Sequence, residues 1–106
     1  MSAEQGFDIH PNAAQDLTEI WEFIAEDSTL AARQVREEIL VAIRKLVRFP
    51  LQGHKRPDLT RQSLRFQTMR DYLIAYAPDH KPLLVIAVLH GRRSPRVIAG
   101  ILRERD

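Results

Sequence analysis

The sequence predicts an α+β fold of order β-αα-βββ-α, in which an antiparallel sheet packs against an N-terminal helical hairpin and a short C-terminal helix. Two changes of pattern predict this order. Apolar residues recur at helical spacing over residues 11–48, and from residue 64 they follow the period of two that strands show. With 106 residues, the chain forms a single domain, residues 1–106, large enough to build one hydrophobic core.

Two amphipathic helices are predicted in the first half of the chain. Asn12 is a suitable N-cap for the first, and Gln15 completes a capping box. The apolar stripe of this helix is Leu17, Ile20, Trp21, Ile24 and Ala25, and its solvent face carries Asp16, Glu19, Glu22 and Glu26. Ser28 caps the second helix, over residues 29–48, and Pro50 ends it because a proline disfavours helical geometry in the preceding residue. A joint this short makes the pair an antiparallel hairpin.

Four segments are predicted to be strands: residues 7–10, 64–68, 72–77 and 83–90. The last is apolar throughout, which predicts a central strand covered on both faces. The last three strands form an antiparallel meander, and the hairpin returns the chain so that the first strand joins the same sheet. Ser94 and Pro95 begin the final helix, which we expect to cover part of the second face. An apolar strip left uncovered there would mark a partner site.

The net charge of +2 conceals a strong asymmetry along the chain. Residues 1–28 hold seven acids and no Lys or Arg, whereas the rest of the chain holds all 16 basic residues and seven acids. Such a bias attracts an anionic partner, either nucleic acid or an acidic protein segment. The alternative is a dipolar surface on which the acidic helix lies beside the basic one.

The composition also excludes several kinds of chemistry. The chain has no cysteine, so disulfides, zinc–thiolate sites and thiol catalysis are ruled out, and we expect no metal and no cofactor. Residues 1–5 have neither the basic region nor the apolar run of a signal peptide. The longest apolar run, residues 83–89, is too short to span a bilayer. We therefore expect a cytoplasmic protein without membrane contact.

Several segments match a known pattern in order and spacing. They are residues 14–20 followed by 23–25, the turn 49–53, and the strand segments 64–65, 71–76 and 88–93. Together they resemble the ParE/RelE superfamily of type II toxin–antitoxin toxins over residues 9–102. This resemblance implies an antitoxin whose tail wraps the toxin in a hetero-oligomer. It also implies one of two activities: RelE-like toxins cut mRNA at the ribosome, whereas ParE-like toxins poison DNA gyrase and leave broken DNA.

The residues needed for RNA cleavage are hard to find in this sequence. The reaction requires a proton acceptor, a proton donor and cations for the developing phosphate charge. RelE-like toxins typically supply a Tyr or His near the C-terminus, but residues 91–106 contain neither. Tyr72 and Tyr76 fall within a strand, where we expect their rings to fill the core, and His54 in the basic loop is a distant second candidate. His90 is then the best candidate, with Arg65 and Arg92 as cations, and the mRNA endonuclease (interferase) is our second hypothesis.

The segment 91–95 and the helix after it are more similar to ParE, the plasmid stabilization proteins, which implies inhibition of gyrase by binding and no catalysis. We expect the target-binding residues to be Lys55, Arg56, Arg65, Arg70, His90, Arg92 and Arg93. Four of these residues are expected to converge: Arg65, Arg70, Arg92 and Arg93. Lys55 and Arg56 are expected at the rim of this cluster. Alternatively, individual arginines pair with Asp71, Asp79 or backbone carbonyls.

The same features predict how the antitoxin binds. A ParD-like antitoxin with an acidic, partly apolar tail would fold over the basic sheet and its uncovered apolar strip. We expect Trp21 in the core, although a partly exposed Trp21 would anchor such a tail. A third hypothesis is a binding relic of the fold that is no longer toxic.

Overall fold

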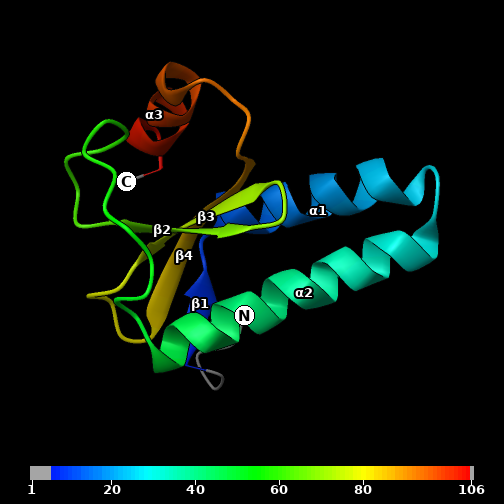
Figure 1. The fold of residues 1–106 in the computed structure, drawn as a ribbon, viewed down its shortest axis with the longest axis horizontal. Coiled ribbons are helices and arrows are strands. Elements are labelled where there is room, and N and C mark those ends of the chain that lie inside the picture. Colours follow the sequence, from blue (N-terminus) through cyan, green and yellow to red (C-terminus); the bar gives the residue numbers. More distant parts are fainter. Residues whose placement is uncertain (1–5, 106) are drawn as a thin grey trace.

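The protein, described by a computed structural model over residues 6–105, has the predicted α+β class and order of elements (Figure 1). Its elements are β1 (Phe7–Ile9), α1 (Pro11–Ala25), α2 (Thr29–Arg48), β2 (Arg65–Met69), β3 (Tyr72–Ala77), β4 (Leu83–His90) and α3 (Pro95–Arg103). The prediction that residues 1–5 form no signal peptide lies outside the described residues. Within them, no helix combines the length and the apolar character that crossing a membrane requires.

The four strands form one sheet in the order β1-β4-β3-β2. The meander of β2, β3 and β4 is antiparallel, as predicted, but β1 pairs parallel with β4, so the sheet is mixed. The connection explains this difference. The helical hairpin returns the chain to Gly6, where β1 begins, and Val47 of α2 contacts Gly6 there. Consequently β2 runs in the same direction as β1, and after two reversals so does β4.

Helices cover both faces of the sheet, so β4 is a central strand packed on both sides, as predicted. The core between the hairpin and the sheet comprises Phe7, Ala13, Val35, Ile39, Ile43, Leu46, Ile74, Tyr76, Leu83, Val85 and Val88. The core under α3 and the loop before β2 comprises Leu59, Leu64, Phe66, Leu73, Ala75, Ala77, Ile86, Ala87, Leu89, Ile98 and Leu102. Each large side chain buried in this way contributes about 1.5–3 kcal/mol.

Two of the three predicted helix starts are confirmed. Ser28 accepts a hydrogen bond from the Ala31 N–H, and Ser94 accepts one from the Val97 N–H. The start of α1 was predicted wrongly, because the N-cap is His10, whose Nδ1 accepts the Asn12 N–H at 3.0 Å. The helix begins two residues earlier than expected because the fixed φ of a proline suits the first helical position, here residue 11.

The hydroxyl of Tyr76 fixes the loop that follows α2. It accepts a hydrogen bond from the Gly53 N–H at 2.9 Å and donates one to the Pro50 carbonyl at 2.7 Å. A Cβ at position 53 would lie 2.6 Å from this hydroxyl and 2.8 Å from the Phe66 carbonyl oxygen, so the approach requires glycine. Burial raises the pKa of Tyr76, and the phenol stays protonated as a donor.

Replacing Tyr76 by Phe tests this contact. The variant leaves the Gly53 N–H and the Pro50 carbonyl without partners, and we expect the free energy of unfolding in urea to fall by about 1–3 kcal/mol. The control is Tyr72→Phe, which removes a hydroxyl from a half-buried ring and should change stability by less than about 0.5 kcal/mol. Equal losses in the two variants would contradict a specific role for Tyr76.

Candidate functional site

A buried ion pair joins α1, β4 and the C-terminal segment. The Arg105 guanidinium donates to both carboxylate oxygens of Asp16, at 2.6 and 2.9 Å, and the Val88 N–H donates to Oδ2 at 3.0 Å. Arg105 also donates to the Ile86 carbonyl at 3.3 Å. Because β1 ends at Ile9, opposite Val85, the rest of β4 has no strand on that side. The ion pair satisfies part of this open edge.

Asp16 was predicted on the solvent face of α1, and that prediction was wrong because its side chain is only 9% exposed. Within the helix, nothing in the spacing distinguishes Asp16 from Glu19. The distinguishing partner, Arg105, lies 89 residues further along the chain. Sequence periodicity alone contains no signal for such a pair.

Beside this ion pair lies an open hollow of about 330 Å³, here called the His90 pocket. It is lined by Asp16, Glu19, Ile20, Phe23, Asp71, Tyr72, Val88, Leu89, His90 and Arg93. The His90 ring meets Tyr72 edge-on, with centroids 5.8 Å apart, and its Nδ1 accepts the Arg92 N–H at 3.2 Å. Burial raises the pKa of Tyr72. In the described part of the chain, no three His, Asp or Glu side chains are placed to hold a metal ion.

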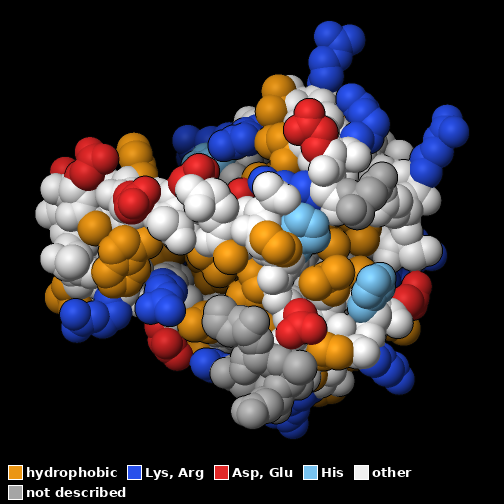
Figure 2. Space-filling model, turned by 180° about the vertical axis from the view of Figure 1, so that it is seen from behind, with side chains coloured by type: hydrophobic (Ala, Val, Ile, Leu, Met, Phe, Trp, Pro, Cys, Tyr) orange, Lys and Arg blue, Asp and Glu red, His pale blue; other side chains and the backbone are white. Residues whose placement is uncertain are grey.

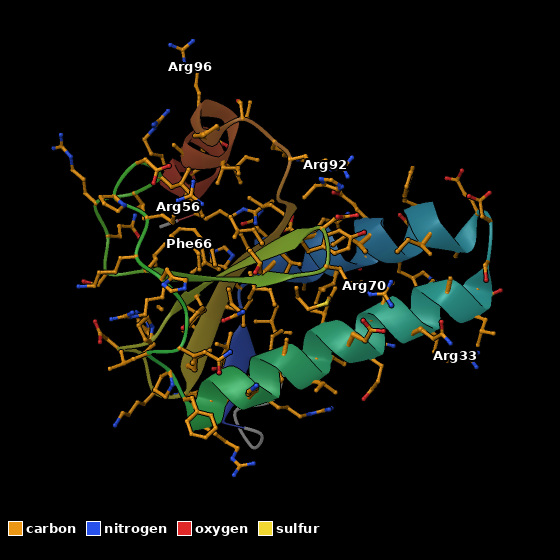
Figure 3. All side chains as sticks on the ribbon, in the orientation of Figure 1. Arg33, Arg56, Phe66, Arg70, Arg92 and Arg96 are labelled. Atoms are coloured by element: carbon orange, nitrogen blue, oxygen red, sulfur yellow. The ribbon has the colours of Figure 1, made fainter. Side chains whose placement is uncertain are left out.

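Strand register divides the predicted cations into two groups at opposite ends of the sheet. Arg65 pairs with Tyr76, whereas Tyr72, at the other end of β3, pairs with both Met69 and His90. Four residues of strand separate the two ends by about 13 Å. Figure 3 shows Arg56 near the start of β2 and Arg70 and Arg92 at the far end. The structure therefore places Lys55, Arg56 and Arg65 at one end of the sheet, and Arg70, His90, Arg92 and Arg93 at the other.

Several of these cations have partners within the protein, although not the predicted aspartates. Arg70 forms a bidentate ion pair with Glu38 of α2, with hydrogen bonds of 2.6 and 2.8 Å, and this contact lowers the pKa of Glu38. Arg56 pairs similarly with Asp58, at 2.8 and 2.9 Å. Arg65 donates to the carbonyls of two loop residues, at 2.7 Å to Gly53 and 3.3 Å to Leu51. These interactions hold the loop and the helical hairpin against the sheet.

The other predicted cations are exposed. Lys55, Arg92 and Arg93 have no ion pair with a carboxylate in the described residues. Their guanidinium and ammonium groups are therefore available to an external anion.

Trp21 lies outside both cores, contrary to the prediction. It is half-buried and lines an open hollow of about 310 Å³, here called the Trp21 pocket, with Ile9, Ala14, Leu17, Thr18 and Arg36. The apolar stripe of α1 is wider than the face that the sheet covers, so Ile20 and Ile24 pack inward while Trp21 faces this pocket. Figure 2 shows apolar side chains along the hairpin, with acidic groups on one side and Lys and Arg on the other.

Comparison with known proteins identifies the kind of molecule that carries these features. A family model described as the ParE toxin of the type II toxin–antitoxin system, parDE, matches residues 7–95. The protein is thus the toxin of a type II toxin–antitoxin pair, and an antitoxin is its partner. Within that class, the chain belongs to the ParE toxin family. No protein with a curated description matches the sequence.

Replacing Asp16 by Asn tests the buried ion pair. The change leaves the Arg105 charge without its partner in a largely desolvated position, and we expect the free energy of unfolding to fall by about 3 kcal/mol. Glu19→Gln, an exposed change on the same helix, should cost less than about 0.5 kcal/mol. Adding Arg105→Gln to Asp16→Asn should cost less than the two single losses combined. If the losses of unfolding free energy in Asp16→Asn and Arg105→Gln were simply additive, the two residues would not be coupled.

Proposed function

We propose that this toxin inhibits DNA gyrase by binding it after the enzyme has cut DNA and before it reseals the break, and that a ParD-like antitoxin neutralises it. The observation that carries the proposal is membership of the ParE family over residues 7–95, which include β4 and the turn with Arg92 and Arg93. Arginine suits such a contact because its planar fork pairs with carboxylates and phosphates.

The arrangement of side chains supports binding over RNA cleavage. An interferase built from His90, Arg65 and Arg92 needs all three around one scissile phosphate. The strand register separates Arg65 from His90 by the length of β2, and Arg65 is engaged by loop carbonyls. Near His90 the pocket also contains carboxylates of Glu19 and Asp71, which repel a phosphate.

One observation favours the second candidate, a RelE-like mRNA endonuclease. His90, Tyr72 and Arg93 line the same pocket, so a proton-transfer group and a cation lie near each other. Under this hypothesis, the toxin would cut mRNA at the ribosome and would not inhibit gyrase. The His90→Ala variant would then lose mRNA cleavage.

The Trp21 pocket fits the antitoxin better than the gyrase. An acidic tail with an apolar anchor matches a hollow that offers Trp21 and Leu17 beside the Arg36 guanidinium. Half-buried tryptophans are frequent anchors because they contribute a large apolar area at the centre of an interface. This assignment places neutralisation on the helical hairpin, and contact with the target on the β4–α3 turn.

A supercoiling assay with purified gyrase tests the proposed target. We expect the toxin to reduce supercoiling and to trap cleaved DNA, and we expect Arg92→Gln/Arg93→Gln to weaken inhibition at least about tenfold. The matched control is Arg33→Gln/Lys45→Gln, which removes the same charge from exposed positions on α2 and should inhibit like the wild type. Unchanged gyrase together with mRNA cutting in a translation extract would favour the endonuclease. Normal growth on expression without an antitoxin would indicate a relic.

Trp21→Ala tests the antitoxin surface. Loss of a buried anchor typically weakens a complex by about 2 kcal/mol, so affinity for the cognate ParD-like antitoxin should fall about thirtyfold in calorimetry. Phe23→Ala provides the control, because this ring is 74% exposed on the same helix and lies outside the Trp21 pocket. Gyrase inhibition should persist in Trp21→Ala, because Trp21 lies outside the His90 pocket. If Trp21→Ala and Phe23→Ala bound the antitoxin with equal affinity, the antitoxin site would not be the Trp21 pocket.

A further inference from the structure

Helix α3 and the loop before β2 together form a second cationic surface, here called the α3 surface, consisting of Lys55, Arg61, Arg96 and Arg103. The loop packs beside the helix, as Figure 1 shows, and Arg61 and Arg103 line one shallow hollow of about 460 Å³ with Ala99. Lys55 and Arg61 share the adjoining hollow, of about 330 Å³. The two hollows make the surface continuous from the loop to the helix.

The two helical arginines lie on one side of α3. Arg96 and Arg103 are seven residues apart, close to two full turns, which separates them by about 10 Å along the axis. Between them on that side lie Ala99 and Gly100, whose small size lets a bulky ligand approach the helix closely. Figure 3 shows the Arg96 side chain extending away from the body of the protein.

Ion pairs within the described residues do not compensate the positive charge of this surface. All four side chains are exposed, and none forms an ion pair with a carboxylate in residues 6–105. The neighbouring acid Asp58 is occupied by Arg56. Segments 55–63 and 92–104 hold seven basic residues and only two acids. The resulting positive potential attracts a polyanion from outside the molecule.

The surrounding side chains indicate which polyanion fits. Residues 55–65 and 91–105 contain no aromatic side chain, so the surface lacks the stacking platform that single-stranded nucleic acids use. The one large apolar side chain exposed on α3 is Val97, too little to anchor a protein tail or a lipid surface. Arginine forks and small residues, by contrast, suit a phosphate backbone. The spacing of about 10 Å between Arg96 and Arg103 along the α3 axis equals the axial rise of about three nucleotides in duplex DNA.

We propose that the α3 surface binds the phosphate backbone of duplex DNA independently of its sequence. The inference rests on the proposed function in one respect: the DNA would be the duplex that gyrase holds, so that the toxin touches both components of the trapped complex. The Arg92–Arg93 turn would contact the enzyme while α3 contacts its DNA.

Fluorescence anisotropy with the full-length toxin and a labelled 30-base-pair duplex, without gyrase, tests the inference. Each phosphate contact adds about 0.9 to the slope of log affinity against log salt. The variant Arg96→Gln/Arg103→Gln should therefore lose about 1.8 from that slope. Between 50 and 200 mM salt, the affinity of the wild type should fall about twelvefold more than that of the variant. The control Arg33→Gln/Lys45→Gln carries the same net charge and should keep the wild-type slope.

The other arms of the experiment separate the alternatives. Equal slopes for the two variants would overturn the inference, as would equally tight binding of single-stranded DNA or of polyglutamate. Melting temperatures of both variants should match the wild type, because every substituted side chain is exposed. A toxin that grips DNA through α3 but leaves gyrase unaffected refutes only the gyrase proposal. Inhibition of gyrase without DNA binding refutes only the α3 inference.

Discussion

The buried pair of Asp16 and Arg105 is the interaction on which the arrangement of the layers depends. The helical hairpin and α3 lie on opposite faces of the sheet, and this pair connects them across the edge of β4 that the short strand β1 leaves open. Desolvating both charges is costly, so their mutual attraction does not alone explain the pair. Its added value is that the same two side chains satisfy the Val88 N–H and the Ile86 carbonyl, which have no neighbouring strand.

Periodicity and turn chemistry predicted most of the fold, because these signals are local. The change from helical spacing to alternation located the sheet, and Ser28 and Ser94 marked two helix starts. The start of α1 was predicted wrongly, again because of local signals: His10 and Pro11 compete with Asn12 for the N-terminus of the helix. The parallel pairing of β1 was not predictable in the same way, because it follows from where a 38-residue excursion through the hairpin returns the chain.

The candidate site was only partly predictable, for a physical reason. Sequence identifies which residues carry positive charge, but strand register decides which of them meet, and it separates Arg65 from the group near His90. Sequence also says that Trp21 lies on an apolar stripe, but the width of the covering sheet decides that its ring faces an open pocket. The result is a toxin with distinct surfaces: an apolar one on the hairpin, and cationic ones at the β4–α3 turn and on α3.

The 89-residue separation of Asp16 and Arg105 has a consequence for biosynthesis. Closing so long a loop costs chain entropy, and contacts of high sequence separation form slowly. Helix α1 is synthesised before β4, yet its docking onto β4 is complete only when Arg105 has been translated. Until Arg105 has been added, the helical hairpin is the part of the toxin already available to a chaperoning partner.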